Sequence, residues 1–268
     1  MKKILKLSVI LISVTLFIIS CSSVPITGRK QLNIIPSGQL LSMSYQQYDQ
    51  FLNENKLSNN QQQTAMVKNV GKKIQNAVEK YMRDNGLADE LEGYQWEFNL
   101  VQSDEVNAWC MPGGKVVFYE GIMPVCQDEN GVAVVMGHEV AHAIAEHGNE
   151  RMSQGLIAQL GGIALSEALK EKPQETQQLW MTAYGLGAQV GVLLPFSRTQ
   201  ESEADRLGLI FMAIAGYNPN HAVDFWTRMA KLGGAAPPEF LSTHPAHDTR
   251  INDIKKHLPE AMSFYNKN

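Results

Sequence analysis

The residues best suited to chemistry in this chain are the two histidines and the glutamate of the pentapeptide His138-Glu139-Val140-Ala141-His142. Residues four apart on a helix lie on one face about one turn apart, so both imidazoles can bind one metal ion. Glu139 projects about 100° away from His138, which places its carboxylate beside the metal rather than on it. There it can act as general base for a metal-bound water. The spacing therefore predicts a hydrolytic metal centre; the alternative is a pair of helix histidines that bind no metal.

The third metal ligand must come from outside this pentapeptide, because a catalytic zinc ion takes three protein ligands and keeps an open position for water. The longer pattern H-E-x-x-H-x-x-G-x-x-H would supply a third histidine, but it does not fit. Gly148 stands at the position of the last histidine, and His147 is one residue out of register. The remaining option is a carboxylate from a later helix.

Two acidic residues, Glu201 and Asp205, share one face of a helix predicted about sixty residues further along the chain. One of these carboxylates can bind zinc, while the other accepts the ring N–H of a ligand histidine. Glu203 points to another side of that helix, and we expect it to be solvated. The alternative is that the acidic residues merely pair with Arg198 and Arg206.

Four segments of the chain together resemble a known family of zinc peptidases. They are H-E-V-A-H at 138–142, S-R-T-Q-E-S-E-A-D at 197–205, S-T-H-P at 242–245, and N-A-W-C-M-P-G-G at 107–114, which is similar to the family's N-A-x-x-x-P-G-G. The family includes CaaX prenyl proteases, HtpX, the mitochondrial Oma-type protease and the bacterial lipoproteins BepA and LoiP. The resemblance covers roughly residues 24–258. It is strongest to the soluble lipoprotein branch, because the several long apolar spans of the membrane-embedded branches are absent here.

This resemblance implies one Zn²⁺ per chain, bound by His138, His142 and Glu201. It also implies that Glu139 is the general base and that Asp205 lies behind the ligands and orients one of them. The implied fold is α+β and mainly helical. It is of the zincin type (gluzincin), with a small antiparallel sheet beside the metal-binding helix.

The elements that must position these residues follow from the hydrophobic pattern. Helical spacing predicts helices at 38–55, 60–85, 129–151, 152–170, 174–194, 197–215 and 219–232. The uncharged stretch 176–197 contains several Gln and Gly residues, which favours a buried helix over a membrane-dipping segment.

Two strands are expected before the metal-binding helix, at 94–101 and 116–119. An exposed edge at Val116, Val117 and Phe118 could hold a peptide substrate as an added strand. Cys110 and Cys126 flank this segment. They could form a disulfide or remain buried free thiols, because spacing alone does not give the distance between their Cα atoms.

The first twenty residues are expected to be a lipoprotein signal peptide. Three lysines precede an apolar run at 7–19 that is too short to span a bilayer comfortably, and Ser20-Cys21 follows it. Cleavage there would leave a lipidated Cys21 that anchors the chain to a membrane. By resemblance to sorted lipoproteins, Ser22 favours the periplasmic face of the outer membrane of a bacterial cell envelope. The alternative is an ordinary signal peptide with an incidental cysteine.

The remaining chain is expected to hold an N-terminal tether at 21–36 and one peptidase domain at 37–268. The full chain carries a net charge of −4, and loss of the three N-terminal lysines makes the mature chain more acidic. No basic stretch is dense enough to bind nucleic acid. For an acidic protein at a membrane face we expect protein or peptide substrates. Contact with envelope assembly machinery is also possible.

His244 is the candidate for a further role, because Pro245 restricts its backbone in the S-T-H-P segment. It could stabilise the oxyanion that forms during hydrolysis, or it could fill the open zinc position in a resting state. A surface histidine without function is the alternative. Arg250 could pair with Asp205, with Glu201 or with substrate, or lie on the surface.

Three functions remain in competition. The leading hypothesis is a lipid-anchored periplasmic zinc endopeptidase that hydrolyses misfolded or misassembled envelope proteins. The second is a chaperone-like binding lipoprotein whose zinc site is latent and blocked by His244. The third is a zinc hydrolase of small esters or amides.

Overall fold

The computed structural model describes residues 21–170, 172–192, 197–232, 238–244 and 249–265. The expected signal peptide lies outside these residues. The chain forms two compact units, of which the first comprises 1–37 and 148–194 and the second 38–147 and 195–268.

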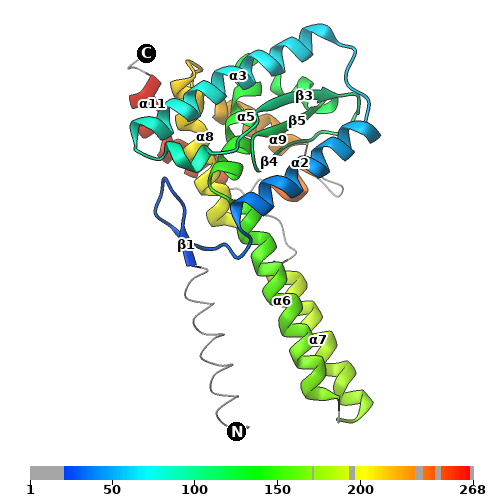
Figure 1. The fold of residues 1–268 in the computed structure, drawn as a ribbon. Helices are drawn as coiled ribbons and strands as arrows, with labels where there is room; N and C mark the ends of the chain where they lie inside the picture. Colours follow the sequence, from blue (N-terminus) through cyan, green and yellow to red (C-terminus); the bar gives the residue numbers. More distant parts are fainter. Residues whose placement is uncertain (1–20, 171, 193–196, 233–237, 245–248, 266–268) are drawn as a thin grey trace. The chain divides into compact units, whose positions relative to one another are not determined.

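The second unit contains a small sheet, its helices and the short elements between them (Figure 1). The strands are β3 (Glu97–Val101), β4 (Ala108–Met111) and β5 (Lys115–Tyr119). The helices are α2 (Ser37–Glu54), α3 (Gln61–Asp84), α4 (Met123–Cys126), α5 (Glu129–Ile144), α8 (Arg198–Ile214), α9 (His221–Lys231), α10 (Glu239–Thr243) and α11 (Arg250–Tyr265), with short 3₁₀ turns η1 (Ala88–Leu91) and η2 (Glu120–Ile122).

The sheet has the strand order β3-β5-β4 and is mixed. The two strands that we expected correspond to β3 and β5, and they pair in parallel rather than in the expected antiparallel sense. β4, which the sequence did not predict, pairs with β5 in the antiparallel sense. The exposed edge expected at Val116–Phe118 is wrong, because these residues lie in β5, which is paired on both sides and buried along its length. The edge strand nearest the metal-binding helix is β4, which contacts α5.

The metal-binding helix α5 runs through the core of this unit, and every residue from Gly131 to Ile144 is buried. Asp128 begins the helix, because its side chain accepts a hydrogen bond from the Gly131 N–H. The helix ends earlier than the expected residue 151. Glu146 adopts a φ of 56°, which is not helical and therefore separates α5 from the next helix.

Two glycines allow α5 and α8 to cross at very short range. A Cβ added to Gly208 of α8 would lie 2.8 Å from the carbonyl carbon of Gly137 and 2.8 Å from the backbone nitrogen of His138. α8 therefore packs alongside α5 (Figure 1). This packing places Glu201 and Asp205 beside the two histidines. A capping box between Ser197 and Gln200 fixes where α8 begins.

The first unit holds β1 (Cys21–Ser23) and β2 (Lys30–Leu32), which pair antiparallel, and the helices α6 (His147–Leu169) and α7 (Gln174–Val192). Arg29 and Glu150 form an ion pair of 2.9 Å that joins the β1–β2 segment to the start of α6. The buried helix expected at 176–197 is wrong for the part that can be described, since Leu179 and Trp180 are 69% and 55% exposed.

α6 also carries a row of exposed apolar residues at helical spacing, Met152, Leu156, Leu160 and Ile163. Among the helices of the described segments, none is both long and apolar enough to cross a bilayer.

Candidate metal centre

Four buried side chains converge at the crossing of α5 and α8, namely His138, His142, Glu201 and His244. The Nε2 atoms of His138 and His142 lie 3.1 Å apart. Glu201 places one carboxylate oxygen 3.3 Å from His142 Nε2 and the other 3.5 Å from His138 Nε2. His244, just after α10, brings its Nδ1 to within 2.9 Å of Glu201 and 3.2 Å of His138. The geometry thus brings the residues expected to bind zinc together with His244.

These separations suit a tetrahedral metal ion. Zinc bonds of about 2.0–2.1 Å to nitrogen and oxygen place neighbouring ligand atoms roughly 3.3 Å apart in a tetrahedron. The five separations range from 2.9 to 3.5 Å. Two facing imidazole nitrogens can share only one hydrogen, and carboxylate oxygens carry none. A cluster in which so many acceptor atoms point at one another is therefore suited to a cation at its centre. The donor set therefore fits a divalent metal such as zinc.

Behind the donors, Arg250 and Asp205 hold His138 and Glu201 in place. Asp205 lies 2.9 Å from His138 Nδ1, so Nε2 is left to face the other donors. Arg250 contacts both oxygens of Asp205 at 2.7 and 2.9 Å and Glu201 at 2.7 Å. Its guanidinium also lies 3.4 Å above the ring centre of Trp226. Arg250 is thus a buried part of the site rather than a surface residue.

The charges of these groups shift their proton affinities in opposite directions. Burial alone would raise the pKa of Asp205 and Glu201, but Arg250 and the neighbouring imidazoles outweigh it and lower both values. Burial disfavours a charged His138, yet hydrogen bonds to Asp205 and Glu201 raise its pKa to about 9. Burial lowers the pKa of His142 well below its usual value, which keeps that imidazole neutral.

Glu139 lies beside the donors, as the sequence predicted, and is 3% exposed. Within the described residues its Oε1 has no hydrogen-bond partner and lies 3.6 Å from His244 Nε2. Burial raises the pKa of Glu139, and the nearby His244 opposes that shift. A buried carboxylate with a free oxygen and a raised pKa is suited to take up a proton.

Behind His142 lies a further pair that the sequence did not reveal. His147 Nδ1 is 2.8 Å from His142 Nδ1, and His147 Nε2 is 2.9 Å from a carboxylate oxygen of Glu203. His147 is fully buried and Glu203 is 8% exposed, so the expectation that Glu203 is solvated is wrong. The direct pairing of the acidic residues with Arg198 and Arg206 was the competing expectation, but Arg206 instead pairs with Glu260.

The two cysteines retained in the folded part do not form the disulfide that was considered. Cys110 on β4 and Cys126 at the end of α4 are free thiols. Burial raises the pKa of each. The alternative of free thiols therefore describes the structure, with Cys126 buried and Cys110 half-buried.

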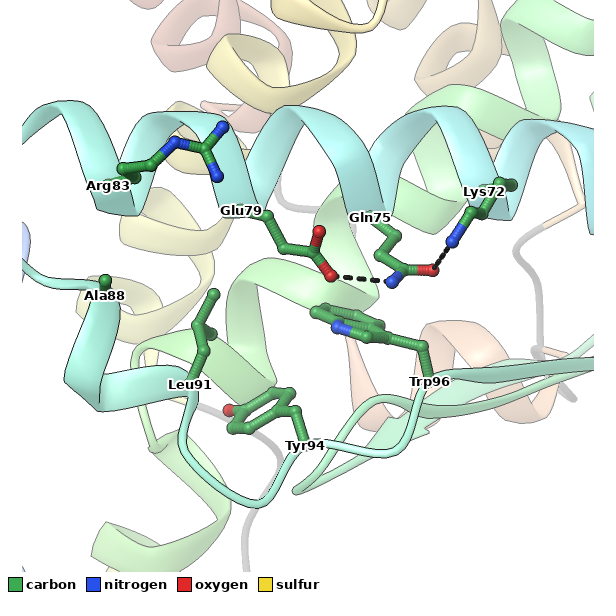
Figure 2. Close-up of a pocket in the computed structure, with 8 residues that line it drawn as sticks. All are labelled: Lys72, Gln75, Glu79, Arg83, Ala88, Leu91, Tyr94 and Trp96. Carbon is green, nitrogen blue, oxygen red and sulfur yellow. Dashed lines mark hydrogen bonds between the residues drawn. The ribbon is translucent and has the colours of Figure 1, made fainter.

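A concavity of about 460 Å³ lies between α3 and the segment that leads into β3 (Figure 2). Its walls are mostly polar and charged on α3 and apolar or aromatic on the segment that leads into β3. The residues are Lys72, Gln75, Glu79, Arg83, Ala88, Leu91, Tyr94 and Trp96. Gln75 bonds both Lys72 and Glu79, so part of the polar lining is satisfied internally. It shares no residue with the donor cluster.

The mainly helical α+β fold, with an H-E-x-x-H helix beside a small sheet, defines a zincin-like protein. The comparisons with known proteins then identify its family. The model of "Peptidase family M48" matches residues 69–258, so the chain belongs to that family.

Curated relatives agree with this assignment. The chain is 36% identical over 214 residues to "Mitochondrial metalloendopeptidase OMA1" of Saccharomyces cerevisiae, covering 74% of this chain and 57% of the relative. It is 27% identical over 246 residues to the human OMA1 metalloendopeptidase, covering 90% of this chain and 46% of the relative. It is 30% identical over 169 residues to "Beta-barrel assembly-enhancing protease" of Yersinia pestis, covering 60% and 34%. The chain thus spans between a third and somewhat over half of the length of these relatives.

Proposed function

We propose that this protein is a zinc-dependent endopeptidase, with His138, His142 and Glu201 as the metal ligands and Glu139 as the general base. The observation that carries the proposal is the buried cluster of donor atoms 2.9–3.5 Å apart, beside which one oxygen of Glu139 has no hydrogen-bond partner among the described residues. Membership of a peptidase family supports it. When bound, zinc would lower the pKa of a water molecule and polarise the scissile carbonyl.

The residues of the chain would divide the remaining work among themselves. Glu139 would take a proton from the attacking water on its free Oε1 and pass it to the leaving amine. Asp205 and Arg250 would keep His138 and Glu201 oriented. β4 is an edge strand next to α5, so its backbone could bind an extended peptide, which requires little side-chain identity of the substrate.

The test measures bound metal and casein cleavage for the wild type and the Glu139→Gln variant. We expect Glu139→Gln to keep the metal and to lose a factor of roughly 10²–10⁴ in cleavage rate, because a proton acceptor is removed without a change of shape. Glu92→Gln, on the exposed surface, is the matched control and should cleave like the wild type. Full activity of Glu139→Gln would show that the assigned base is wrong.

A second candidate function is a latent metal site in a chaperone-like binding protein. It is favoured by His244, whose Nδ1 occupies the fourth corner of the donor cluster at 2.9 Å from Glu201. A histidine in that corner would exclude the water needed for hydrolysis. In that case His244→Ala raises cleavage above the wild type; if His244 instead stabilises the oxyanion, the same variant lowers cleavage by roughly 10²–10³.

We further propose that the protein is anchored to a membrane of the bacterial envelope through lipidated Cys21 and lies on the periplasmic face of the outer membrane. The exposed apolar row on α6 supports this, because it belongs to the same compact unit as Cys21. Radiolabelled palmitate incorporation and membrane fractionation test the anchor. We expect both to be lost in Cys21→Ser and unchanged in Ser23→Ala.

The substrates proposed are misfolded or misassembled envelope proteins, and the envelope assembly machinery is a proposed partner. The name of the Yersinia relative, a β-barrel assembly-enhancing protease, supports this direction. The test offers folded and unfolded forms of one outer-membrane protein as competing substrates. Preferential cleavage of the unfolded form is expected, and cleavage of small esters without either protein would favour a small-molecule hydrolase instead.

A further inference from the structure

The rear nitrogen of each ligand histidine is connected to a carboxylate of α8, but by two different routes. His138 Nδ1 meets Asp205 directly at 2.9 Å. His142 Nδ1 meets another imidazole, that of His147, at 2.8 Å, and this imidazole meets Glu203 at 2.9 Å. The second route passes through the fully buried His147 to the buried Glu203, and it has no part in the function proposed above.

We propose that His147 and Glu203 are positioning residues that fix His142 in the tautomer able to bind metal. The inference rests on the proposed metal site, because it concerns how one ligand of that site is prepared. It assigns a role to a buried histidine that cannot reach the donor cluster itself, since its two ring nitrogens are already engaged by His142 and Glu203.

The number of hydrogens on the ring nitrogens determines which group donates at each step from His142 through His147 to Glu203. Two ring nitrogens 2.8 Å apart share one hydrogen, which belongs to either His142 or His147. His142 can bind a metal through Nε2 only if that atom carries no hydrogen, so in the neutral ring the hydrogen must be on Nδ1. His147 must then accept at Nδ1 and carry its own hydrogen on Nε2, which points at Glu203.

The charge of Glu203 selects this arrangement. A carboxylate can only accept, so it requires a hydrogen on His147 Nε2 and leaves Nδ1 bare in the neutral ring. The opposite order would place a hydrogen on His147 Nδ1 and force one onto His142 Nε2, where it would occupy the position of the metal. Glu203 thereby determines, through one intermediate imidazole, which nitrogen of His142 faces the donor cluster.

The break between α5 and α6 gives this series of hydrogen bonds its geometry. The φ of 56° at Glu146 turns the backbone so that the His147 ring packs edge-to-face against His142, with ring centres 4.9 Å apart. If the helix continued without a break, His147 would lie about 140° around the helix axis from His142, on another face. The helix end is therefore part of the arrangement that prepares the ligand.

The main test is Glu203→Gln, which keeps the shape of the side chain but can donate as well as accept. Both tautomers of His147 then become possible, and part of the His142 population carries its hydrogen on Nε2. We expect the zinc dissociation constant, measured by competition with a chromophoric chelator, to rise about 10–100-fold. In the metal-free protein, ¹⁵N chemical shifts should show His142 as the Nδ1–H tautomer in the wild type and as a mixture in Glu203→Gln.

Two further variants separate positioning from general stability. His147→Asn retains an acceptor near the position of Nδ1 and should keep most of the zinc affinity, whereas His147→Phe should lose it. Glu260→Gln breaks an ion pair with Arg206 of the same helix α8 and is the matched control, with unchanged affinity and tautomer expected.

Each outcome decides between the two proposals. If the wild type binds no zinc, the proposed metal site itself fails. If the wild type binds zinc and Glu203→Gln binds it equally well with an unchanged His142 tautomer, the metal site stands and the positioning role is refuted. An equal loss of affinity in Glu260→Gln would also refute it, because the effect would then be one of helix stability.

Discussion

The crossing of α5 and α8 at Gly137 and Gly208 determines how closely the ligands approach, and Gly208→Ala tests this directly. A Cβ at residue 208 would lie 2.8 Å from backbone atoms of Gly137 and His138, whereas ordinary contacts begin at 3.4 Å. Backbone atoms inside two packed helices cannot rotate away as a side chain can. The helices must therefore separate by about 0.6 Å to admit the methyl group.

The magnitude follows from what each helix carries. α5 holds His138 and His142, and α8 holds Glu201, so the separations of 3.3 and 3.5 Å between them grow by a similar amount. Metal–ligand distances tolerate about 0.2 Å, so binding must draw the helices together again. Overpacking of this kind costs about 1–3 kcal/mol, which corresponds to a loss of roughly 5–150-fold in zinc affinity.

The stability of the metal-free protein should change much less than its zinc affinity. There the strain can relax, and alanine is favoured over glycine in a helix by about 1 kcal/mol. The assay compares zinc dissociation constants with urea unfolding of the metal-free form. Gly38→Ala is the control, because its Cβ meets nothing within 4 Å. A Gly208→Ala variant with wild-type zinc affinity would refute the claim that this crossing sets the ligand distances.

Three other predictions follow from buried and paired charges. Arg250→Met leaves the carboxylates of Glu201 and Asp205 without their cation, so we expect urea unfolding to show a loss of about 3–5 kcal/mol; a change as small as that of Arg206→Met at the surface would contradict this. The hydrogen bond from Arg206 lowers the pKa of Glu260, so its stabilisation is complete above the unfolded-state pKa of about 4.3 and is lost as pH falls through the lower folded-state value. Because both side chains of the pair are more than a third exposed, Glu260→Gln should cost less than about 1 kcal/mol at pH 7 and still less at pH 3. An equal cost at both pH values would contradict this prediction. Cys110 and Cys126 should resist iodoacetamide at pH 8 in the folded protein and react without reductant after unfolding, because burial raises the pKa of both thiols; mass spectrometry would reveal a disulfide by the absence of that reaction.

The part of the site that could be predicted from the sequence is the part set by helical periodicity. His138 and His142, and likewise Glu201 and Asp205, lie four residues apart, so each pair shares a face whatever the rest of the fold does. His147 and Arg250 follow no such rule. His147 depends on the helix break at Glu146, and Arg250 depends on how α11 packs against α8.

The sheet illustrates the same distinction between local and long-range information. The run Val116-Val117-Phe118 predicted a strand correctly, and its lack of alternating polar residues was already typical of a strand buried on both faces. The parallel pairing of β3 with β5, and the position of β4 at the edge, result from contacts between segments far apart in the chain. The hydrophobic pattern alone does not contain this order.

Charge balance gives an argument for a divalent ion that does not depend on family membership. The charged groups that contact the four donors are the carboxylates of Glu139, Glu201 and Asp205 and the guanidinium of Arg250, and all four side chains are at most 6% exposed. When the imidazoles are neutral, as binding of a metal through their ring nitrogens requires, these groups sum to −2, and an uncompensated buried charge costs several kcal/mol per ion. A dication at the centre of the donors brings the sum to zero. The pairing of Arg250 with both Asp205 and Glu201 then also sets the charge of the site. Without the Arg250 guanidinium the remaining groups would sum to −3, which one divalent ion could not neutralise.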